Sequence, residues 1–377
     1  MLATALAASL PFVFPAPALS APHDPPGQRP SSTLSFSSSS DLFVVTSSDI
    51  TSSDHFGRSL DVDGSIALVG SRYAAHSGVI LSGAAYVFEQ HGLNWVETHK
   101  LIPPDPADQD LFGHDVAVSG DTLLISARND DLGAVVDAGS AYVFVKDGAD
   151  WTLQAHLMAP DADAFDAFGI SVDIDGDRAV VGAALNDEFG QEDVGAAYVF
   201  SREAGVWTFE AKLMASDGAD GDTFGRGVAV WGETIAVGAP RHDSLGLERA
   251  GAVYVFDRLD GAWSESAKLV APDAMPGDDL GDALVLEGDT LLVGASLDDH
   301  QGQLDVGSVG VFVRADGTWM PQAKLLASDG IAGDQFGHYM ALDGDRAAVG
   351  ASQARVGLVE QAGSAYQFER VGGQWTE

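Results

Sequence analysis

Short apolar stretches recur along the chain in a fixed order. The first stretch of each unit alternates apolar and polar positions, as in residues 227–231, and predicts a strand with one buried face. The second is almost continuously apolar, as in residues 179–181, which is typical of a strand covered on both faces. A third is marked by Tyr-Val-Phe, and a fourth opens at a tryptophan and ends in Lys-Leu, as at Lys212-Leu213. No segment has a sustained helical period, so the pattern predicts four strands per unit.

The unit repeats every 56 residues without an insertion. A Phe-Gly pair, replaced by Leu-Gly in the fifth unit, opens the first strand. These pairs begin at Phe56, Phe112, Phe168, Phe224, Leu280 and Phe336. The tryptophans of the fourth strand keep the same step: Trp95, Trp151, Trp207, Trp263, Trp319 and Trp375. Four antiparallel strands in a repeat of this length predict an all-β fold, a β-propeller of four-stranded blades.

Six such units are present, and the fourth strand of the last ends after three residues at Glu377. Residues 39–46 stand in the register of the missing strand, since Val45 falls where Leu325 falls. We therefore expect six blades with an N-terminal strand closing the ring, which removes exposed sheet edges. The alternative is a seven-bladed array cut short.

The N-terminal region differs in composition from the repeats. Residues 1–20 are uncharged, contain an apolar run and end in a small-x-small pattern, which predicts a signal peptide despite the absence of Lys or Arg at its start. Residues 21–38 are rich in Pro and then Ser, and predict a flexible leader before a propeller at 39–377. The expected location is therefore secreted or at the cell surface, with no transmembrane helix.

Charge and cysteine content narrow the functional classes. The formal net charge is −37, with 19 Lys plus Arg against 56 Asp plus Glu, which excludes a nucleic-acid footprint. Such a charge suits cations, basic partners or solubility in salt. No cysteine is present, so thiolate metal sites, disulfides and Cys nucleophiles are excluded. We expect a monomeric domain.

The motif pair Phe-Gly and Val237-Gly238-Ala239-Pro240 resembles the FG-GAP repeat of integrin α-subunit propellers and their bacterial relatives. The resemblance covers residues 39–377 and implies adhesion or partner binding outside the cell, often with bound calcium. One departure concerns the calcium loop, which in that family is an elongated acidic segment between the first two strands. Here Asp61-Val62-Asp63-Gly64 and residues 173–177 keep only the start of it, so the family's calcium ligands do not carry over.

A different acidic pattern recurs in this chain. Each Phe-Gly or Leu-Gly pair has one Asp two positions upstream and another seven positions upstream, and the loop between the second and third strands adds more. All of these should lie on one rim of the propeller. The first hypothesis is that they cap backbone N–H groups in turns. The second is that they bind calcium in units two to five, with these candidate ligands: Asp105, Asp110, Asp131, Asp137, Asp161, Asp166, Asp187, Asp193, Asp217, Asp222, Asp243, Asp273, Asp278, Asp299 and Asp305.

No motif of a known catalytic class is present, and the non-repeating Trp231, His242 and Arg249 form no recognisable triad. His114 and His338 are interpreted as surface or packing residues. We expect a non-enzymatic binding module for an extracellular protein or glycan, assisted by calcium. The alternatives are a propeller hydrolase or lyase that uses rim carboxylates, and a structural fragment of a longer surface protein.

Overall fold

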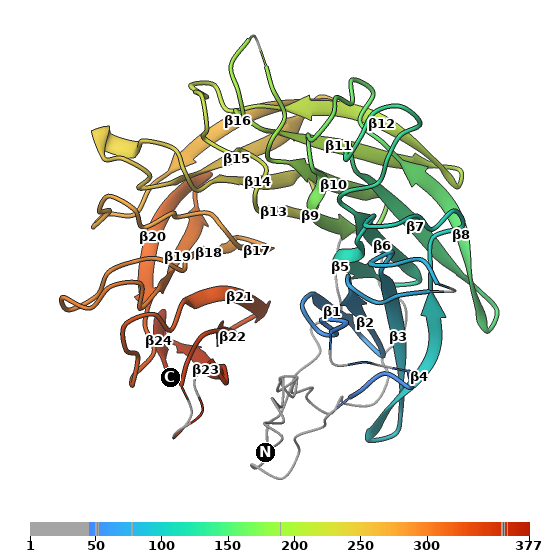
Figure 1. Cartoon of the computed structure of the whole chain (residues 1–377). Helices are drawn as coiled ribbons and strands as arrows, with labels where there is room; N and C mark the ends of the chain where they lie inside the picture. The colour runs from blue at the N-terminus through green and yellow to red at the C-terminus, as the bar shows by residue number, and fades with distance from the viewer. Residues whose placement is uncertain are drawn as a thin grey trace, which may run out of the picture.

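The computed structural model describes residues 45–377 except residues 50, 52, 77, 189, 356, 358 and 360. The predicted signal peptide, the leader and most of the predicted closing strand therefore lie outside the described residues. Within them, the chain forms six four-stranded antiparallel sheets, arranged in sequence order around a ring (Figure 1). One short 3-10 turn, η1 (Ser244–Gly246), is the only helical element there. The predicted all-β propeller of six four-stranded blades is confirmed.

Each blade uses its four strands in the order predicted. The first strands lie nearest the axis (Figure 1): β1 (Leu60–Asp63), β5 (Phe112–Ser119), β9 (Phe168–Asp175), β13 (Val228–Trp231), β17 (Leu284–Glu287) and β21 (Phe336–Asp343). The second strands are β2 (Ile66–Ser71), β6 (Thr122–Ala127), β10 (Arg178–Ala183), β14 (Thr234–Ala239), β18 (Thr290–Ala295) and β22 (Arg346–Ala351).

The third and fourth strands complete each sheet on its outer side. The third strands are β3 (Ala84–His91), β7 (Ser140–Asp147), β11 (Ala196–Glu203), β15 (Ala252–Leu259), β19 (Ser308–Ala315) and β23 (Ser364–Val371). The fourth are β4 (Asn94–Leu101), β8 (Asp150–Leu157), β12 (Val206–Leu213), β16 (Ala262–Leu269), β20 (Thr318–Leu325) and β24 (Gln374–Thr376). A register shift recurs where the third strand meets the fourth, as between Val199 and Phe200.

The hydrophobic core lies between blades rather than within one. Leu68 and Val87 of blade 1 pack in one cluster with Phe112, Ile125 and Tyr142 of blade 2. Every residue of β6, β14 and β18 is buried. This confirms that the continuously apolar second strands are covered on both faces, as side-by-side blades require.

The motif glycines are explained by the close approach of neighbouring blades. A Cβ on Gly70, at the end of β2, would lie 2.3 Å from the carbonyl oxygen of Gly113, which belongs to the next Phe-Gly pair. The same contact joins Gly238 to Gly281, at 1.9 Å. The two motif glycines of a unit therefore face partners in adjacent blades, and only a residue without a side chain fits on either side.

The seam between blade 6 and blade 1 is less well covered than the other blade interfaces. Ala348, Ala365 and Gln367 are exposed, although their equivalents in blade 5, which are Leu292, Val309 and Val311, are fully buried against blade 6. β24 pairs with β23 only at residues 369–371. Val45 packs on the core of blade 1. Ring closure by residues 39–46 stays a prediction, because residues 39–44 lie outside the described part.

Candidate functional site

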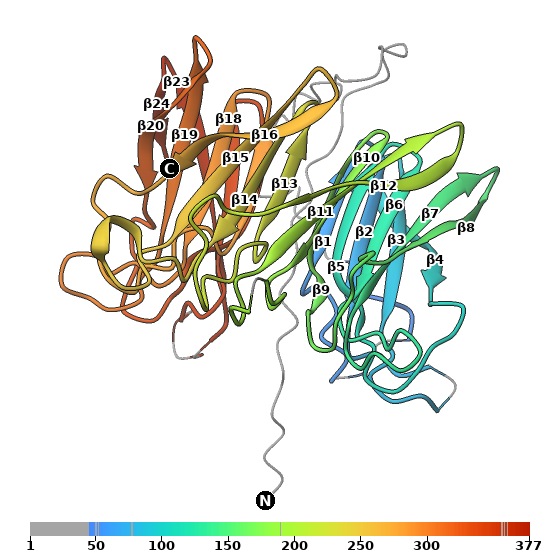
Figure 2. The ribbon, with the colours of Figure 1, turned by 90° about the horizontal axis from the view of Figure 1, so that it is seen from above.

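The propeller has two dissimilar rims, seen along the lower and upper edges of Figure 2. We call one the loop rim: it consists of the loops between second and third strands, such as 128–139, and the connections between blades, such as 158–167. We call the other the hairpin rim: it consists of two-residue turns, such as Gly120-Asp121 between β5 and β6. All fifteen predicted candidate ligands lie in the segments of the loop rim, as expected.

The Asp seven residues before each Phe-Gly pair is held by side chains of the third and fourth strands. Asp217 accepts a hydrogen bond from the Tyr254 hydroxyl at 2.6 Å and pairs with Lys268 Nζ at 2.6 Å. Asp49 has the same two kinds of partner, Tyr86 and Lys100. Burial acts to raise the pKa of Asp217, but the hydrogen bonds from Lys268 and Tyr254 and the charge of Lys268 outweigh it, so the pKa is lowered; burial raises the pKa of Tyr254. This carboxylate thus joins the outer strands of a blade to the connection that precedes that blade.

The same arrangement continues around the ring with variations. Its members are Asp105 with Tyr142, Asp161 with Lys212, Asp273 with Lys324, and Asp329 with Tyr366.

The Asp two residues before each Phe-Gly or Leu-Gly pair caps a turn. Its carboxylate accepts a hydrogen bond from the backbone N–H three residues earlier in every blade, at 2.6–2.9 Å. These residues are Asp54, Asp110, Asp166, Asp222, Asp278 and Asp334. In this series, the carboxylates therefore cap turns, as the first hypothesis states. Burial, added to by neighbouring carboxylates, raises the pKa of Asp110 and of Asp278 to about 6.

The acidic residues of the second-to-third loops cap those loops in turn. Asp131 accepts from the N–H of Asp137 at 2.8 Å, and Asp187 from that of Asp193 at 2.9 Å. Asp299 and Asp305 repeat this, and Asp243 accepts from Arg249 instead. Among the described residues, no three His, Asp or Glu side chains converge as metal ligands. The candidate ligands share a rim, but they are spread over separate loops and connections of the blades.

The Asp residues that resemble the start of a calcium loop have a different role, which sequence reasoning missed. They lie on the inner strands and accept hydrogen bonds from the backbone of the next blade. Asp61 accepts from Val118 N–H and Asp63 from Gly120 N–H, both at 2.7 Å. Asp173 and Asp175 hold residues 230 and 232 in the same way. Because inner strands of neighbouring blades share no backbone ladder, these carboxylates satisfy N–H groups that would otherwise lack a partner.

The two histidines that follow Phe-Gly differ in their surroundings. His114 is buried, and its Nδ1 accepts a hydrogen bond from Arg72 Nη1 at 3.3 Å. His338 lies 3.3 Å from Asp282, which also pairs with Arg226 at 3.1 Å. In blade 4, His242 bridges Asp222 at 2.8 Å and Lys268 Nζ at 2.7 Å. These non-repeating residues fill positions near the axis or inside the loops, and the repeat pattern itself contains no signal for them.

The FG-GAP repeat family model matches the chain six times, at residues 43–88, 95–144, 151–200, 207–256, 263–312 and 319–368. The chain belongs to the FG-GAP repeat family. None of the curated proteins matches it. FG-GAP propellers are typically binding or structural modules, and FG-GAP repeats are typical of extracellular or surface proteins. Within the described residues, no helix has the length and apolar character needed to cross a membrane.

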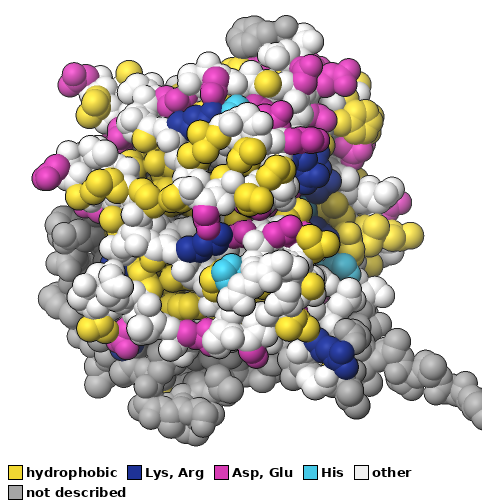
Figure 3. Space-filling view, turned by 90° about the vertical axis from the view of Figure 1, so that its left-hand side faces the viewer, with side chains coloured by type: hydrophobic (Ala, Val, Ile, Leu, Met, Phe, Trp, Pro, Cys, Tyr) yellow, Lys and Arg dark blue, Asp and Glu magenta, His cyan; other side chains and the backbone are white. Residues whose placement is uncertain are grey.

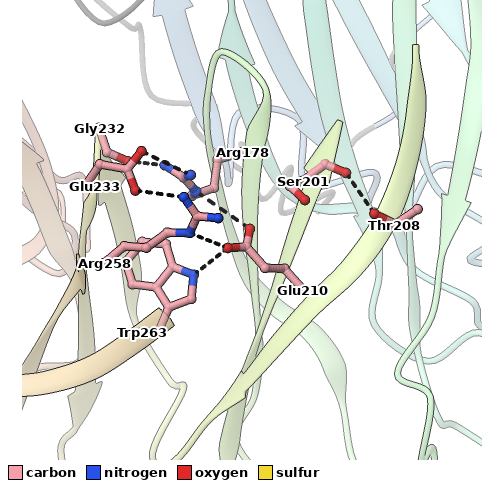
Figure 4. Close-up of polar contacts among 8 residues, drawn as sticks. All are labelled: Arg178, Ser201, Thr208, Glu210, Gly232, Glu233, Arg258 and Trp263. Carbon is pink, nitrogen blue, oxygen red and sulfur yellow. Dashed lines mark hydrogen bonds and ion pairs between the residues drawn. The ribbon is translucent and has the colours of Figure 1, made fainter. Parts of the chain in front are cut away.

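On the hairpin rim, this FG-GAP propeller fastens adjacent blades with ion pairs. Arg258 donates from Nε to Glu210 at 2.5 Å and lies 3.5 Å from Glu233, while Trp263 donates from its indole N–H to Glu210 at 3.1 Å (Figure 4). Arg178 of blade 3 reaches the same Glu233 and stacks over the Trp263 ring. Near the hairpin rim, Arg178 and Arg258 therefore form contacts that hold blades 3 and 4 together.

The loop rim of the FG-GAP propeller exposes apolar side chains among its carboxylates. Ile80, Phe165 and Met275 are 61%, 60% and 55% exposed. Others on this rim are Val136, Met158, Leu245, Leu304, Ile331 and Val359. The side of the propeller, seen in the space-filling view, also has apolar side chains lying among acidic and basic ones (Figure 3). The loop rim itself combines apolar contact area with charge that selects the partner, a mixture typical of interaction sites.

Proposed function

We propose that the chain is a protein-interaction module whose loop rim is the binding face. The observation that carries the proposal is the set of exposed apolar residues on loops that are held in place by the neighbouring blade. Phe165 N–H bonds to the carbonyl of Val136 at 3.0 Å, and Gly333 N–H to that of Leu304 at 3.0 Å. Loops fixed in this way present side chains with little ordering cost on binding.

A protein partner is favoured over a glycan by the kind of side chain exposed. In the exposed apolar set of the loop rim, Phe165 is the single aromatic residue, whereas sugar recognition typically uses aromatic faces. Trp151, Trp207 and Trp319 are buried between blades, so their rings are not available to stack on a sugar. The carboxylates around the loop-rim residues favour a partner with basic side chains. Extracellular or surface placement is part of the proposal and rests on the predicted signal peptide and on the family.

The proposal is tested by comparing substitutions on the two rims. One variant replaces three loop-rim residues by Ser: Ile80, Phe165 and Met275. A matched control replaces three hairpin-rim residues by Ser: Leu93, Val206 and Leu259. These control residues are 64%, 62% and 68% exposed. Each immobilised protein is incubated with extracellular proteins of the source organism, and retained proteins are identified. We expect the loop-rim variant to lose partners that the wild type and the control retain; equal retention by both variants would refute the proposal.

Calcium assistance at the loop rim is a prediction for blades 2–5. Its measurement is thermal melting after EDTA treatment, with and without millimolar calcium. A cation that binds the folded protein raises the melting midpoint through ligand linkage. A smaller rise after changing Asp187 and Asp193 of blade 3 to Asn would support the prediction, and a wild-type midpoint unchanged by calcium would exclude it.

A further inference from the structure

Most basic side chains of this acidic protein have a carboxylate partner. All five lysines lie in ion pairs: Lys100, Lys146, Lys212, Lys268 and Lys324. The arginines that stack on blade tryptophans are also paired, as Arg202 is with Asp177 at 2.6 Å and Arg370 with Asp345 at 2.6 Å. This is the expected state for 19 basic groups among 56 acidic ones.

Three of the arginines that depart from that rule gather at one place. Arg58 follows the first Phe-Gly pair, Arg72 follows β2, and Arg128 follows β6 at the position equivalent to Arg72. These positions place them at the loop-rim ends of β1, β2 and β6, on the side of the blades nearest the axis (Figure 1), and we call the three residues the axial arginine cluster. None of the three lies within 4.0 Å of a carboxylate in the described part of the chain. Arg58 donates to the hydroxyl of Tyr339 at 2.6 Å, across the seam between blades 1 and 6.

The guanidinium groups of these arginines have few partners. Arg72 donates to His114 and stacks over the Tyr73 ring, with 4.7 Å between its Cζ and the ring centroid. Arg128 makes no hydrogen bond within the described residues. The Nε atoms of Arg72 and Arg128 are buried without a hydrogen-bond partner there. A buried donor without an acceptor is costly, so both groups are suited to an acceptor from outside the chain.

The positive charges of the axial arginine cluster repel one another. Burial lowers the pKa of Arg72, and the neighbouring Arg58 lowers it further; burial and then Arg226 do the same for Arg128. Burial and the four arginines of the region lower the pKa of His114 to about 2. The imidazole is therefore neutral and can accept the hydrogen bond from Arg72.

The carboxylates near the three arginines have other contacts or form no ion pair with them. Asp282 is held by Arg226 and His338. Asp115 accepts from the Ser59 hydroxyl and from the Val172 backbone N–H. Asp137 lines a small pocket of about 100 Å³ together with Arg128, but the two side chains form no ion pair. None of these three neutralises Arg58, Arg72 or Arg128 by direct contact.

We propose that the axial arginine cluster binds an oxyanion, a carboxylate or an inorganic oxyanion such as sulfate, through Arg58, Arg72 and Arg128. The geometry supports this with three guanidinium groups that form no ion pair with a carboxylate in the described part of the chain, two of which have buried donors without an acceptor. Planar guanidinium groups match the paired oxygens of such anions. The site is independent of partner docking on the loops, since a free anion can occupy it when no protein is bound.

The test measures sulfate and succinate binding by isothermal titration at constant ionic strength, with chloride as the balancing anion. The proteins are the wild type, the double variant Arg72→Gln/Arg128→Gln and the control Arg241→Gln, whose exposed arginine lies in the second-to-third loop of blade 4. We expect saturable binding to the wild type and the control, and weakening by about tenfold or more in the double variant. Tighter binding of succinate would point to a carboxylate ligand, and tighter binding of sulfate to an inorganic one.

Two results would overturn the proposal. One is the absence of saturable binding of either anion to the wild type, and the other is equal binding by all three proteins. Melting without anion adds a readout independent of the ligand. Because the substitutions remove guanidinium groups that repel one another, the melting midpoint of the double variant should be no lower than that of the wild type. The same holds for Arg128→Gln alone. A clearly lower midpoint in Arg128→Gln would show that this arginine serves the fold instead.

Discussion

Changing Phe224 to Ala should cost about 3–5 kcal/mol of unfolding free energy. Phe224 is fully buried between blades 3 and 4, and its ring meets those of Tyr254 and Phe256 edge-on, with centroids 5.6 Å and 6.1 Å away. Truncation removes these contacts and leaves a cavity that the flanking sheets cannot fill without moving. The measurement is urea-induced unfolding, compared at constant m-value.

The matched control is Phe165→Ala on the loop rim. Phe165 is 60% exposed, so its loss should change the free energy of unfolding by no more than about 0.5 kcal/mol. Equal destabilisation by the two substitutions would contradict the assignment of the Phe-Gly phenylalanine to the blade interface. Leu280, which replaces this residue in blade 5, is likewise buried, so Phe224→Leu should be far milder than Phe224→Ala.

Changing Gly238 to Ala should destabilise the protein by about 3 kcal/mol, at the upper end of the cost of overpacking. The added methyl group would lie 1.9 Å from the carbonyl oxygen of Gly281. That atom belongs to the backbone of the next blade and cannot rotate away as a side chain could. Blades 4 and 5 would have to separate, and we expect a lower midpoint in both thermal and urea unfolding.

The control for Gly238 is Gly288→Ala in a hairpin turn. A Cβ there meets nothing within 4 Å, but the backbone has φ of +56°, which costs an alanine about 1 kcal/mol. The difference between the two substitutions isolates the steric contact between blades from the backbone preference of glycine. If Gly288→Ala were the more damaging of the two, the proposed role of the motif glycine would be wrong.

The architecture could be predicted from the sequence because each blade contains the same local signals. The continuous apolar run at residues 179–181 lies in β10, and the tryptophan at position 207 is the second residue of β12, next to the turn that precedes this strand. The turn-capping role of Asp166 was also predictable, because its partner lies only three residues away. Contacts within one unit can be inferred from spacing alone.

Contacts between units could not be inferred in this way. Asp61 meets the backbone of Val118, and Arg58 meets Tyr339. Such pairs depend on how far each blade is rotated about the axis and on the ring bringing blade 6 beside blade 1. Arg72 and Arg128 differ from Ala184, Pro240, Ser296 and Ser352 at the same repeat position. That break in the repeat was the available signal for the axial arginine cluster, but its consequence required the three-dimensional arrangement.

The binding role of the loop rim is tested most directly by hydrogen–deuterium exchange on the propeller, free and in complex with a retained partner protein. The account predicts slower exchange on binding in the loop-rim segments, such as 128–139 and 158–167, with the turns at 120–121 and 260–261 unchanged. Slower exchange confined to the hairpin rim, or to the outer strands, would contradict it.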